Sequence, residues 1–219
     1  MIKLVVFDWN GVLIADAQAD ADAVSHILQS FGRKPLSLKR FREIFEIPAK
    51  STYLKAGLSE NELNGEQKRM SDMFHDYYEP RIAHVRTRHG ARRLLEWLSE
   101  RKIECVILSN HTIEGIRSQL NRLGIQSFFS TVLANNKYTA MKGQNKLEKL
   151  TQFLDEHSYK KKEALIIGDS PEETLVGKRL GIHSVAITGG YVSTRRLREA
   201  RPDHLIHKLT DMIDIIKKL

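Results

Sequence analysis

Residues that can do chemistry stand at the ends of several short apolar runs. The run L-V-V-F, residues 4–7, is typical of a strand buried on both faces, and Asp8 follows it directly. Ser109 and Asn110 follow a second run, and Asp169 follows the run A-L-I-I-G. In an open parallel sheet the carboxyl ends of the strands line one crevice, where ligands bind. The pattern therefore predicts two carboxylates, a hydroxyl and an amide at one site.

A lysine can complete this group. Lys142 precedes a helix that we expect to begin near Gly143, which allows its ammonium to reach the same crevice. The alternative is that Asp8 only begins a turn. In that interpretation Asn10-Gly11 is a hairpin signal, because both residue types tolerate a positive φ. The joint placement of all these groups at predicted strand ends favours a site.

The order of apolar patterns predicts the fold class. From residue 86 onward, short apolar runs alternate with segments of helical period, and such alternation indicates βαβ units and a parallel sheet. We therefore expect an α/β protein with a Rossmann-like parallel-sheet core. The predicted strands cover residues 4–7, 103–108, 131–134, 164–167 and 184–187, and residues 211–219 are expected to close the chain as a helix.

Residues 16–85 contain no strand signal and interrupt this α/β chain. Their apolar residues recur at helical spacing, which predicts a small all-helical cap inserted into a core formed by residues 1–15 and 86–219. Ser59 and Glu62 have the spacing of a capping box. We expect them to open one long helix through Tyr77, closed by Pro80.

Composition restricts the function classes. The chain has 219 residues, 41% of them hydrophobic, and no apolar segment long enough to span a membrane. Asp8 and Asn10 interrupt the first apolar run, which argues against a signal peptide. The single Cys105 permits no intrachain disulfide and favours a reducing, cytoplasmic location. The net charge is +8, but the basic residues are scattered and not interleaved with aromatic ones, which argues against a nucleic-acid partner. The oligomeric state is not readable from the sequence.

The motifs together resemble those of the haloacid dehalogenase-like (HAD) superfamily, in its phosphoglycolate phosphatase-like branch with an inserted helical cap. The similarity runs over essentially the whole chain in the family's order: F-D-W-N-G-V at 7–12, L-S-N at 108–110, M-K-G at 141–143 and I-G-D-S-P-E-E-T at 167–174. The stretches G-I-H-S-V-A-I-T-G-G-Y and P-D-H-L-I are similar to the family's C-terminal strands.

The resemblance implies a role for each matching residue. It assigns a catalytic set of Asp8, Asn10 and Lys142, with Asp8 as the nucleophile that forms an aspartyl-phosphate. It implies a Mg²⁺ site made by Asp8, the backbone carbonyl of Asn10, and Asp169. Phosphate binding falls to Ser109, Asn110 and Lys142, and Glu173, or alternatively Glu172, would orient the lysine or a water. Lys146 competes with Lys142, but the K-G dipeptide resembles a family variant, and Lys146 is interpreted as an exposed helical residue.

One departure from the family pattern bears on activity. The family's phosphatases carry a second aspartate two residues after the nucleophile, which protonates the leaving oxygen and activates water. Here that residue is Asn10, whose amide cannot transfer the proton although its backbone carbonyl is unchanged. The loss of a general acid or base typically costs about 10² to 10⁴ in rate. We therefore expect slow hydrolysis, least affected for substrates with good leaving groups.

The expected function is Mg²⁺-dependent hydrolysis of a small phosphorylated metabolite. The alternative is a catalytically impaired family member that binds a phosphorylated ligand, for which Asn10 is the only support in the sequence. Substrate choice is expected to lie in the cap, whose basic candidates for a second anionic group are Arg33, Lys34, Arg40, Arg42 and Lys50. His111 is interpreted as a solvated loop residue.

Overall fold

A six-stranded parallel sheet forms the centre of the computed structural model, which describes residues 1–136 and 146–219. The strand order is β3-β2-β1-β4-β5-β6, and every neighbouring pair is parallel. This order is that of a Rossmann-like sheet, so the predicted fold class is confirmed. The bounds are β1 (Leu4–Phe7), β2 (Glu104–Thr112), β3 (Thr131–Asn135), β4 (Ala164–Gly168), β5 (His183–Ile187) and β6 (His204–Ile206).

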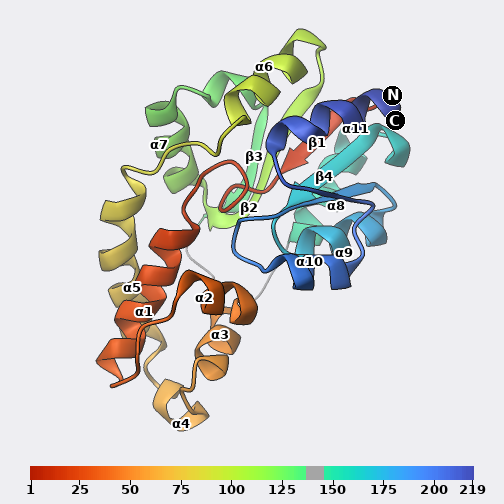
Figure 1. Cartoon of the computed structure of the whole chain (residues 1–219). Helices are drawn as coiled ribbons and strands as arrows, with labels where there is room; N and C mark the ends of the chain where they lie inside the picture. The colour runs from red at the N-terminus through yellow and green to blue at the C-terminus, as the bar shows by residue number, and fades with distance from the viewer. Residues whose placement is uncertain (137–145) are drawn as a thin grey trace.

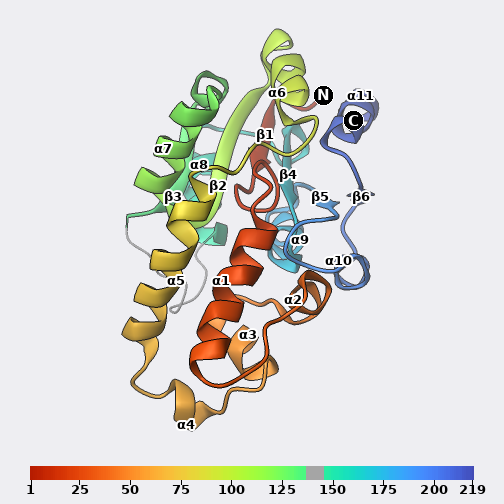
Figure 2. The same ribbon diagram turned by 60° about the vertical axis from the view of Figure 1, so that its left-hand side comes forward.

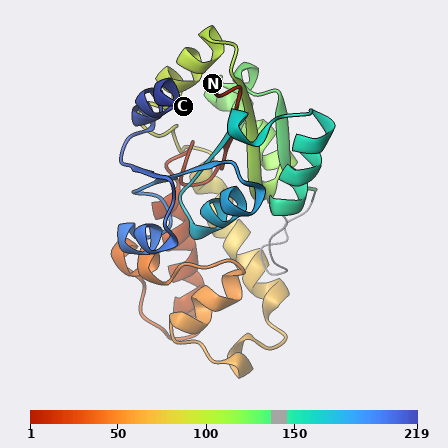
Figure 3. The same cartoon turned by 90° about the vertical axis from the view of Figure 1, so that its right-hand side faces the viewer.

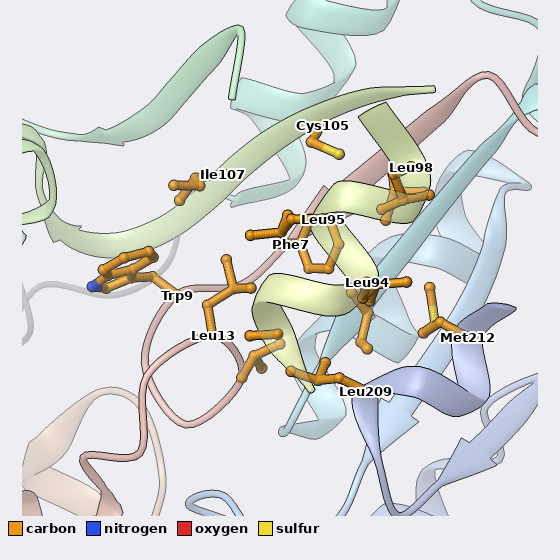
Figure 4. Close-up of a cluster of buried hydrophobic side chains, with 14 of the residues drawn as sticks. Phe7, Trp9, Leu13, Leu94, Leu95, Leu98, Cys105, Ile107, Leu209 and Met212 are labelled. Atoms are coloured by element: carbon orange, nitrogen blue, oxygen red, sulfur yellow. The ribbon is translucent and has the colours of Figure 1, made fainter. Parts of the chain in front are cut away.

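Strand β1 lies in the middle of the sheet and is fully buried. Alternate side chains enter different layers, because successive residues of a strand point to opposite faces. Val5 and Phe7 pack in the layer that contains helix α6 (Ala91–Glu100), whereas Leu4 and Val6 pack against helices on the other face. Figure 4 shows the side chain of Phe7 near the leucines that α6 directs into this core.

Helices cover both faces of the sheet (Figures 1 and 2). The further helices of this part are α7 (Ile113–Leu123), α8 (Lys146–Glu156), α9 (Pro171–Leu180), α10 (Thr194–Ala200) and α11 (Met212–Lys218). Short 3₁₀ turns cover Gln126–Phe128, Lys161–Glu163 and Leu209–Asp211. Both termini lie at the end of the sheet remote from α1–α5 (Figures 1 and 3).

Five consecutive helices follow β1 and form what we call the helical unit, residues 17–82. They are α1 (Ala17–Ser30), α2 (Leu38–Ile44), α3 (Ala49–Lys55), α4 (Glu60–Leu63) and α5 (Gln67–Ile82). Helices α1 and α5 run side by side beyond the carboxyl ends of the strands (Figures 1 and 2). The apolar core of the unit also includes Tyr191 and Val192 from the loop after β5, so the unit packs directly on the sheet part.

The long helix expected after Ser59 is wrong in its bounds. The capping box of Ser59 and Glu62 is present, but α4 ends at Leu63, and α5 begins only at Gln67. Gly65 between them has a φ of +78°, a conformation that a helix does not continue. Pro80 lies inside the last turn of α5 instead of closing it. A proline removes a single backbone donor there, and the helix ends shortly afterwards at Ile82.

No helix in the described ranges, 1–136 and 146–219, is long and apolar enough to cross a membrane.

Candidate active site

The strand ends bring together the acidic residues that the sequence singles out. Phe7 pairs with Ile107 of β2 and with Ile167 of β4, so Asp8 lies level with the last residue of β4 and beside the carboxyl-terminal part of β2. Asp169 follows β4 directly, and both carboxylates are buried. Asp8 Oδ1 accepts a hydrogen bond from the backbone N–H of Trp9 at 2.8 Å. The predicted convergence on one crevice is present in the structure.

Lys146 is the lysine that the described residues bring to this crevice. Its side chain is buried, with Nζ 3.0 Å from Asp8 Oδ1, 2.5 Å from Glu173 Oε1 and 3.6 Å from Glu172 Oε2. Burial alone would lower the pKa of Lys146, but these three carboxylates raise it well above its usual value, so the ammonium is retained. The prediction that Lys146 is exposed is wrong.

The preferred alternative, Lys142, lies in 137–145, outside the described residues. A sequence signal for Lys146 did exist, because it stands four residues before Leu150 and seven before Phe153. These positions form the buried stripe of α8.

Three carboxylates of the site form a possible metal-binding group. One oxygen each from Asp8, Asp169 and Glu173 lies within 4.8 Å of the others. Asp169 Oδ2 also accepts the backbone N–H of Tyr191 at 2.6 Å. Burial raises the pKa of Asp8 to about 7, against the opposing effect of Lys146. Burial and the neighbouring Asp8 raise the pKa of Asp169 well above its ordinary value. A cation bound here would stabilise the ionised forms of both groups.

Two glycines allow Asp169 to sit this close to the backbone. A Cβ at Gly11 would lie 2.0 Å from Asp169 Oδ2, and one at Gly190 would lie 1.9 Å from the same atom. Gly11 also has a φ of +70°, which strains any other residue. Gly11 and Gly190 thus allow the backbone to pass close to the Asp169 carboxylate.

Ser109 and Asn110 lie in the carboxyl-terminal part of β2, where its pairing with β3 shifts register between Leu108 and Thr112. Ser109 Oγ accepts the backbone N–H of His111 at 3.1 Å, and Asn110 Nδ2 donates to Glu172 Oε2 at 3.1 Å. His111 is buried, and burial lowers its pKa, so the expectation of a solvated histidine is wrong. All three residues line the crevice.

Sequence reasoning missed Asp16, the most extensively bonded carboxylate of this region. It is fully buried; its Oδ1 accepts Gly11 N–H at 2.7 Å, and its Oδ2 accepts the hydroxyls of Tyr78 at 2.6 Å and Tyr191 at 2.7 Å. The side-chain amide of Asn10 donates to the same Oδ2 at 2.6 Å. Asp16 therefore joins the loop after β1, helix α5 and the loop after β5.

Asp20, one turn further along α1, is buried beside Asp16. Burial, with a smaller contribution from Asp16, raises the pKa of Asp20 to about 8. A signal in the sequence could have found it, because Asp20 stands four residues before Val24 and so interrupts the apolar stripe of α1.

One cavity of about 180 Å³ opens over the strand ends. Its sheet side is lined by Asp8, Ser109, Lys146 and Asp169, and the helical unit lines the opposite side. Polar groups that converge at one end of a largely apolar cavity are typical of a ligand site. The fold and the site together define an α/β protein with an acidic, lysine-containing centre at its strand ends.

Comparison with known proteins identifies the family. A model described as haloacid dehalogenase-like hydrolase matches residues 5–187, and the chain therefore belongs to the haloacid dehalogenase-like hydrolases. This confirms the resemblance drawn from the motifs.

Similar curated proteins are phosphoglycolate phosphatases. One from Pseudomonas fluorescens is 26% identical over 217 residues, covering 96% of this chain and 78% of its own length. One from Synechococcus elongatus is 22% identical, and the match covers 100% of this chain and 99% of that protein. A solved haloacid dehalogenase-like hydrolase from Streptococcus pneumoniae superimposes with a TM-score of 0.82 at 22% identity, covering 98% of both chains. A structure described as a predicted phosphoglycolate phosphatase from Haemophilus somnus gives 0.80 at 19% identity, again over 98% of both. These structures support the fold.

Replacing Asp20 should change how stability depends on pH. The folded protein keeps the Asp20 proton up to about pH 8, whereas the unfolded chain loses it near pH 3.8. The folded state therefore binds more protons in this window, and its free energy of unfolding falls as the pH rises through it. In metal-free protein, Asp20→Asn should make that decline shallower by up to about 1.4 kcal/mol per pH unit.

Urea unfolding at pH 5, 6, 7 and 8 measures this slope. Asp22→Asn is the matched control, because Asp22 lies on the same helix and its carboxylate accepts a hydrogen bond from Gln18 at the surface. Equal slopes for wild type and Asp20→Asn would contradict the prediction.

Proposed function

We propose that the protein is a Mg²⁺-dependent phosphohydrolase that cleaves a small phosphorylated metabolite through an aspartyl-phosphate on Asp8. The observation that carries the proposal is the single crevice in which Asp8, Ser109, Lys146 and Asp169 meet, with the lysine ammonium 3.0 Å from the carboxylate. The phosphoglycolate phosphatases among its relatives support a phosphate substrate.

The donor set fits a divalent cation. Carboxylate oxygens of Asp8 and Asp169, with the backbone carbonyl of Asn10, would hold Mg²⁺, a cation that prefers oxygen ligands. When bound, the cation would neutralise phosphoryl charge and bring the anionic nucleophile and the phosphate together. Glu173 lies in the same group, but its ion pair with Lys146 favours a positioning role for this carboxylate.

The chain's own residues then supply the remaining chemistry. A carboxylate oxygen of Asp8 bonds to phosphorus while the bond from phosphorus to the ester oxygen breaks, and the leaving oxygen takes up a proton. The Ser109 hydroxyl and the Asn110 backbone N–H bind phosphoryl oxygens, and Lys146 offsets the added negative charge. Water then cleaves the aspartyl-phosphate, which releases phosphate and restores Asp8.

Proton transfer to the leaving oxygen is the weak point of this site. The Asn10 amide donates hydrogen bonds to Asp16 at 2.6 Å and to the Tyr78 hydroxyl at 3.0 Å, and an amide does not act as an acid or base in this pH range. Substrates whose leaving oxygen needs little protonation should therefore be preferred. The alternative function, a phosphate-binding protein without useful turnover, rests on the same residue.

We also propose that residues 16–85 act as the cap and that residues 1–15 and 86–219 form the catalytic core. The support is the position of the helical unit, which lines the side of the cavity opposite Asp8. A cytoplasmic location remains a prediction from the sequence.

Phosphate release should depend on both Mg²⁺ and Asp8. We expect wild-type protein to release phosphate from aryl phosphates only with Mg²⁺, and Asp8→Asn to reduce the rate to background because an amide cannot form the aspartyl-phosphate. Asp22→Asn should behave as wild type. The assay is phosphate release from a panel of phosphorylated metabolites and a generic aryl phosphate. Equal rates for wild type and Asp8→Asn would instead favour the binding-protein alternative.

Comparison of three lysine variants identifies the site lysine. Lys146→Met should lower turnover at least about 10²-fold, since it removes the cation that faces both nucleophile and phosphate. Lys149→Met is the control on the same helix, because Lys149 donates a hydrogen bond to Asn135 and not to a carboxylate of the site. Circular dichroism and thermal unfolding establish that each variant folds. If Lys142→Met abolishes turnover and Lys146→Met does not, Lys142 is the site lysine.

Restoring an aspartate at residue 10 should favour poor leaving groups. Asn10→Asp provides a carboxylic acid whose pKa the nearby Asp16 would raise, so it can donate a proton near neutral pH. We expect turnover of an alkyl phosphate to rise by about 10-fold or more relative to an aryl phosphate. The ratio of the two rates serves as its own control, and an unchanged ratio would count against Asn10 as the limiting residue.

A further inference from the structure

The cavity offers two chemically different ends. The end at the strand termini carries the groups assigned above to phosphate and metal. The opposite end is formed by the helical unit and is the place left for the rest of the substrate. Its chemistry therefore indicates what the leaving group of the phosphate ester can be.

Apolar and aromatic side chains dominate the end formed by the helical unit. Val24, Tyr53 and Met70 are each at most 5% exposed, and they come from three different helices. The principal apolar residues of this wall are Val24, Phe45, Ile47, Tyr53, Met70 and Phe74. An uncharged apolar group would bury its surface here without losing hydrogen bonds to water.

None of the lysines and arginines in residues 16–85, all of which are described, lines the cavity. The expected basic candidates are held elsewhere. Arg33 pairs with Glu62 at 2.7 Å, and Lys50 pairs with Glu60. Arg42 donates to the backbone carbonyls of Gly189 and Gly190 at 2.7 and 2.8 Å. Arg40 donates to the carbonyl of Lys55, and Lys34 is exposed.

The acidic residues of the same wall do not bring a free cation to the cavity. Glu46 contributes its carboxylate to ion pairs with Lys55 and Arg196. Asp20, with its pKa raised by burial to about 8, is protonated at neutral pH. His75 also lines this wall, and its Nδ1 lies 3.5 Å from Glu79 Oε1. A carboxylate or second phosphate on the leaving group would thus be buried without a lysine or arginine of the helical unit to pair with it, which is strongly unfavourable.

We propose that the substrate is a phosphate monoester whose leaving group is apolar and carries no second anionic group. This inference rests on the proposed function and refines it. It also separates the chain from its phosphoglycolate phosphatase relatives, because phosphoglycolate carries a carboxylate beside its phosphate.

Binding of two matched phosphonates tests the inference without requiring turnover. Benzylphosphonate and 4-carboxybenzylphosphonate differ only in the second anionic group. Titration calorimetry of the wild-type protein with Mg²⁺ should show benzylphosphonate binding at least about tenfold more tightly. Equal affinity, or tighter binding of the carboxylated compound, overturns the inference, as does a failure of both compounds to bind.

Turnover of the corresponding phosphates separates this inference from the proposed function. We expect kcat/KM to be higher for phenyl phosphate than for 4-carboxyphenyl phosphate and phosphoglycolate. Efficient hydrolysis of phosphoglycolate would leave the phosphohydrolase proposal standing and overturn the substrate class. Tight, selective binding of benzylphosphonate with no turnover of any ester would support the ligand class and overturn the phosphohydrolase proposal.

A cation placed in the wall should weaken the selectivity. Ser71 lines the cavity from α5, and Ser71→Lys should reduce the affinity ratio of the two phosphonates about tenfold, since it pairs the added carboxylate. Gln67→Lys, on the exposed start of the same helix, is the control and should leave the ratio unchanged. Ala49→Lys, from α3, provides a second placement if Ser71→Lys does not fold. A ratio unaffected by either cavity lysine overturns the inference.

Discussion

One buried lysine balances several carboxylates at the carboxyl ends of the strands, and the rest of the site depends on that balance. Lys146 contacts Asp8 and Glu173 and lies near Glu172, while Asp169 adds a further acid to the group. An unpaired charge in such a position would be strongly destabilising, and one ammonium does not neutralise all of these groups. Burial raises the pKa values of Asp8 and Asp169, and the neighbouring carboxylates raise them further. The acidic cluster is therefore a possible metal-binding group.

A second buried carboxylate, Asp16, fixes the helical unit over that centre. Its oxygens accept hydrogen bonds from the loop after β1, from Tyr78 of α5 and from Tyr191 after β5. Hydrogen bonds to a charged acceptor are stronger than those between neutral groups. The Asn10 amide is part of the same arrangement, since it donates a hydrogen bond to Asp16. The residue to which we assign the loss of a general acid therefore also contributes to the structure.

The parts that the sequence predicted well depend on local pattern. The buried strand L-V-V-F, the acids at strand ends and the capping box at Ser59 all follow from residue type and spacing. The expectation that Lys146 is exposed was wrong because the K-G dipeptide at Lys142 was weighed above the helical period, which places Lys146 on the buried stripe with Leu150. The choice of Lys142 itself falls outside the described residues. The Asp16 bonds were not predictable, since Tyr78 and Tyr191 lie 62 and 175 residues away. Helix α10 has Leu197 as its buried residue, too little for a periodic signal.

Two independent features of the site favour the same kind of ester. In the proposed mechanism Asn10 cannot protonate a leaving oxygen, so the chemistry would favour leaving groups that depart as stable anions. The wall formed by the helical unit is largely apolar, and no lysine or arginine of residues 16–85 lines it, so the proposed binding mode favours leaving groups without a second charge. A phenolic leaving group meets both conditions, because its oxygen is more acidic than an alkyl alcohol and its ring is apolar. The two arguments use different residues, Asn10 beside the nucleophile and Val24, Met70 and Phe74 across the cavity. Their agreement therefore gives the substrate class more support than either observation alone.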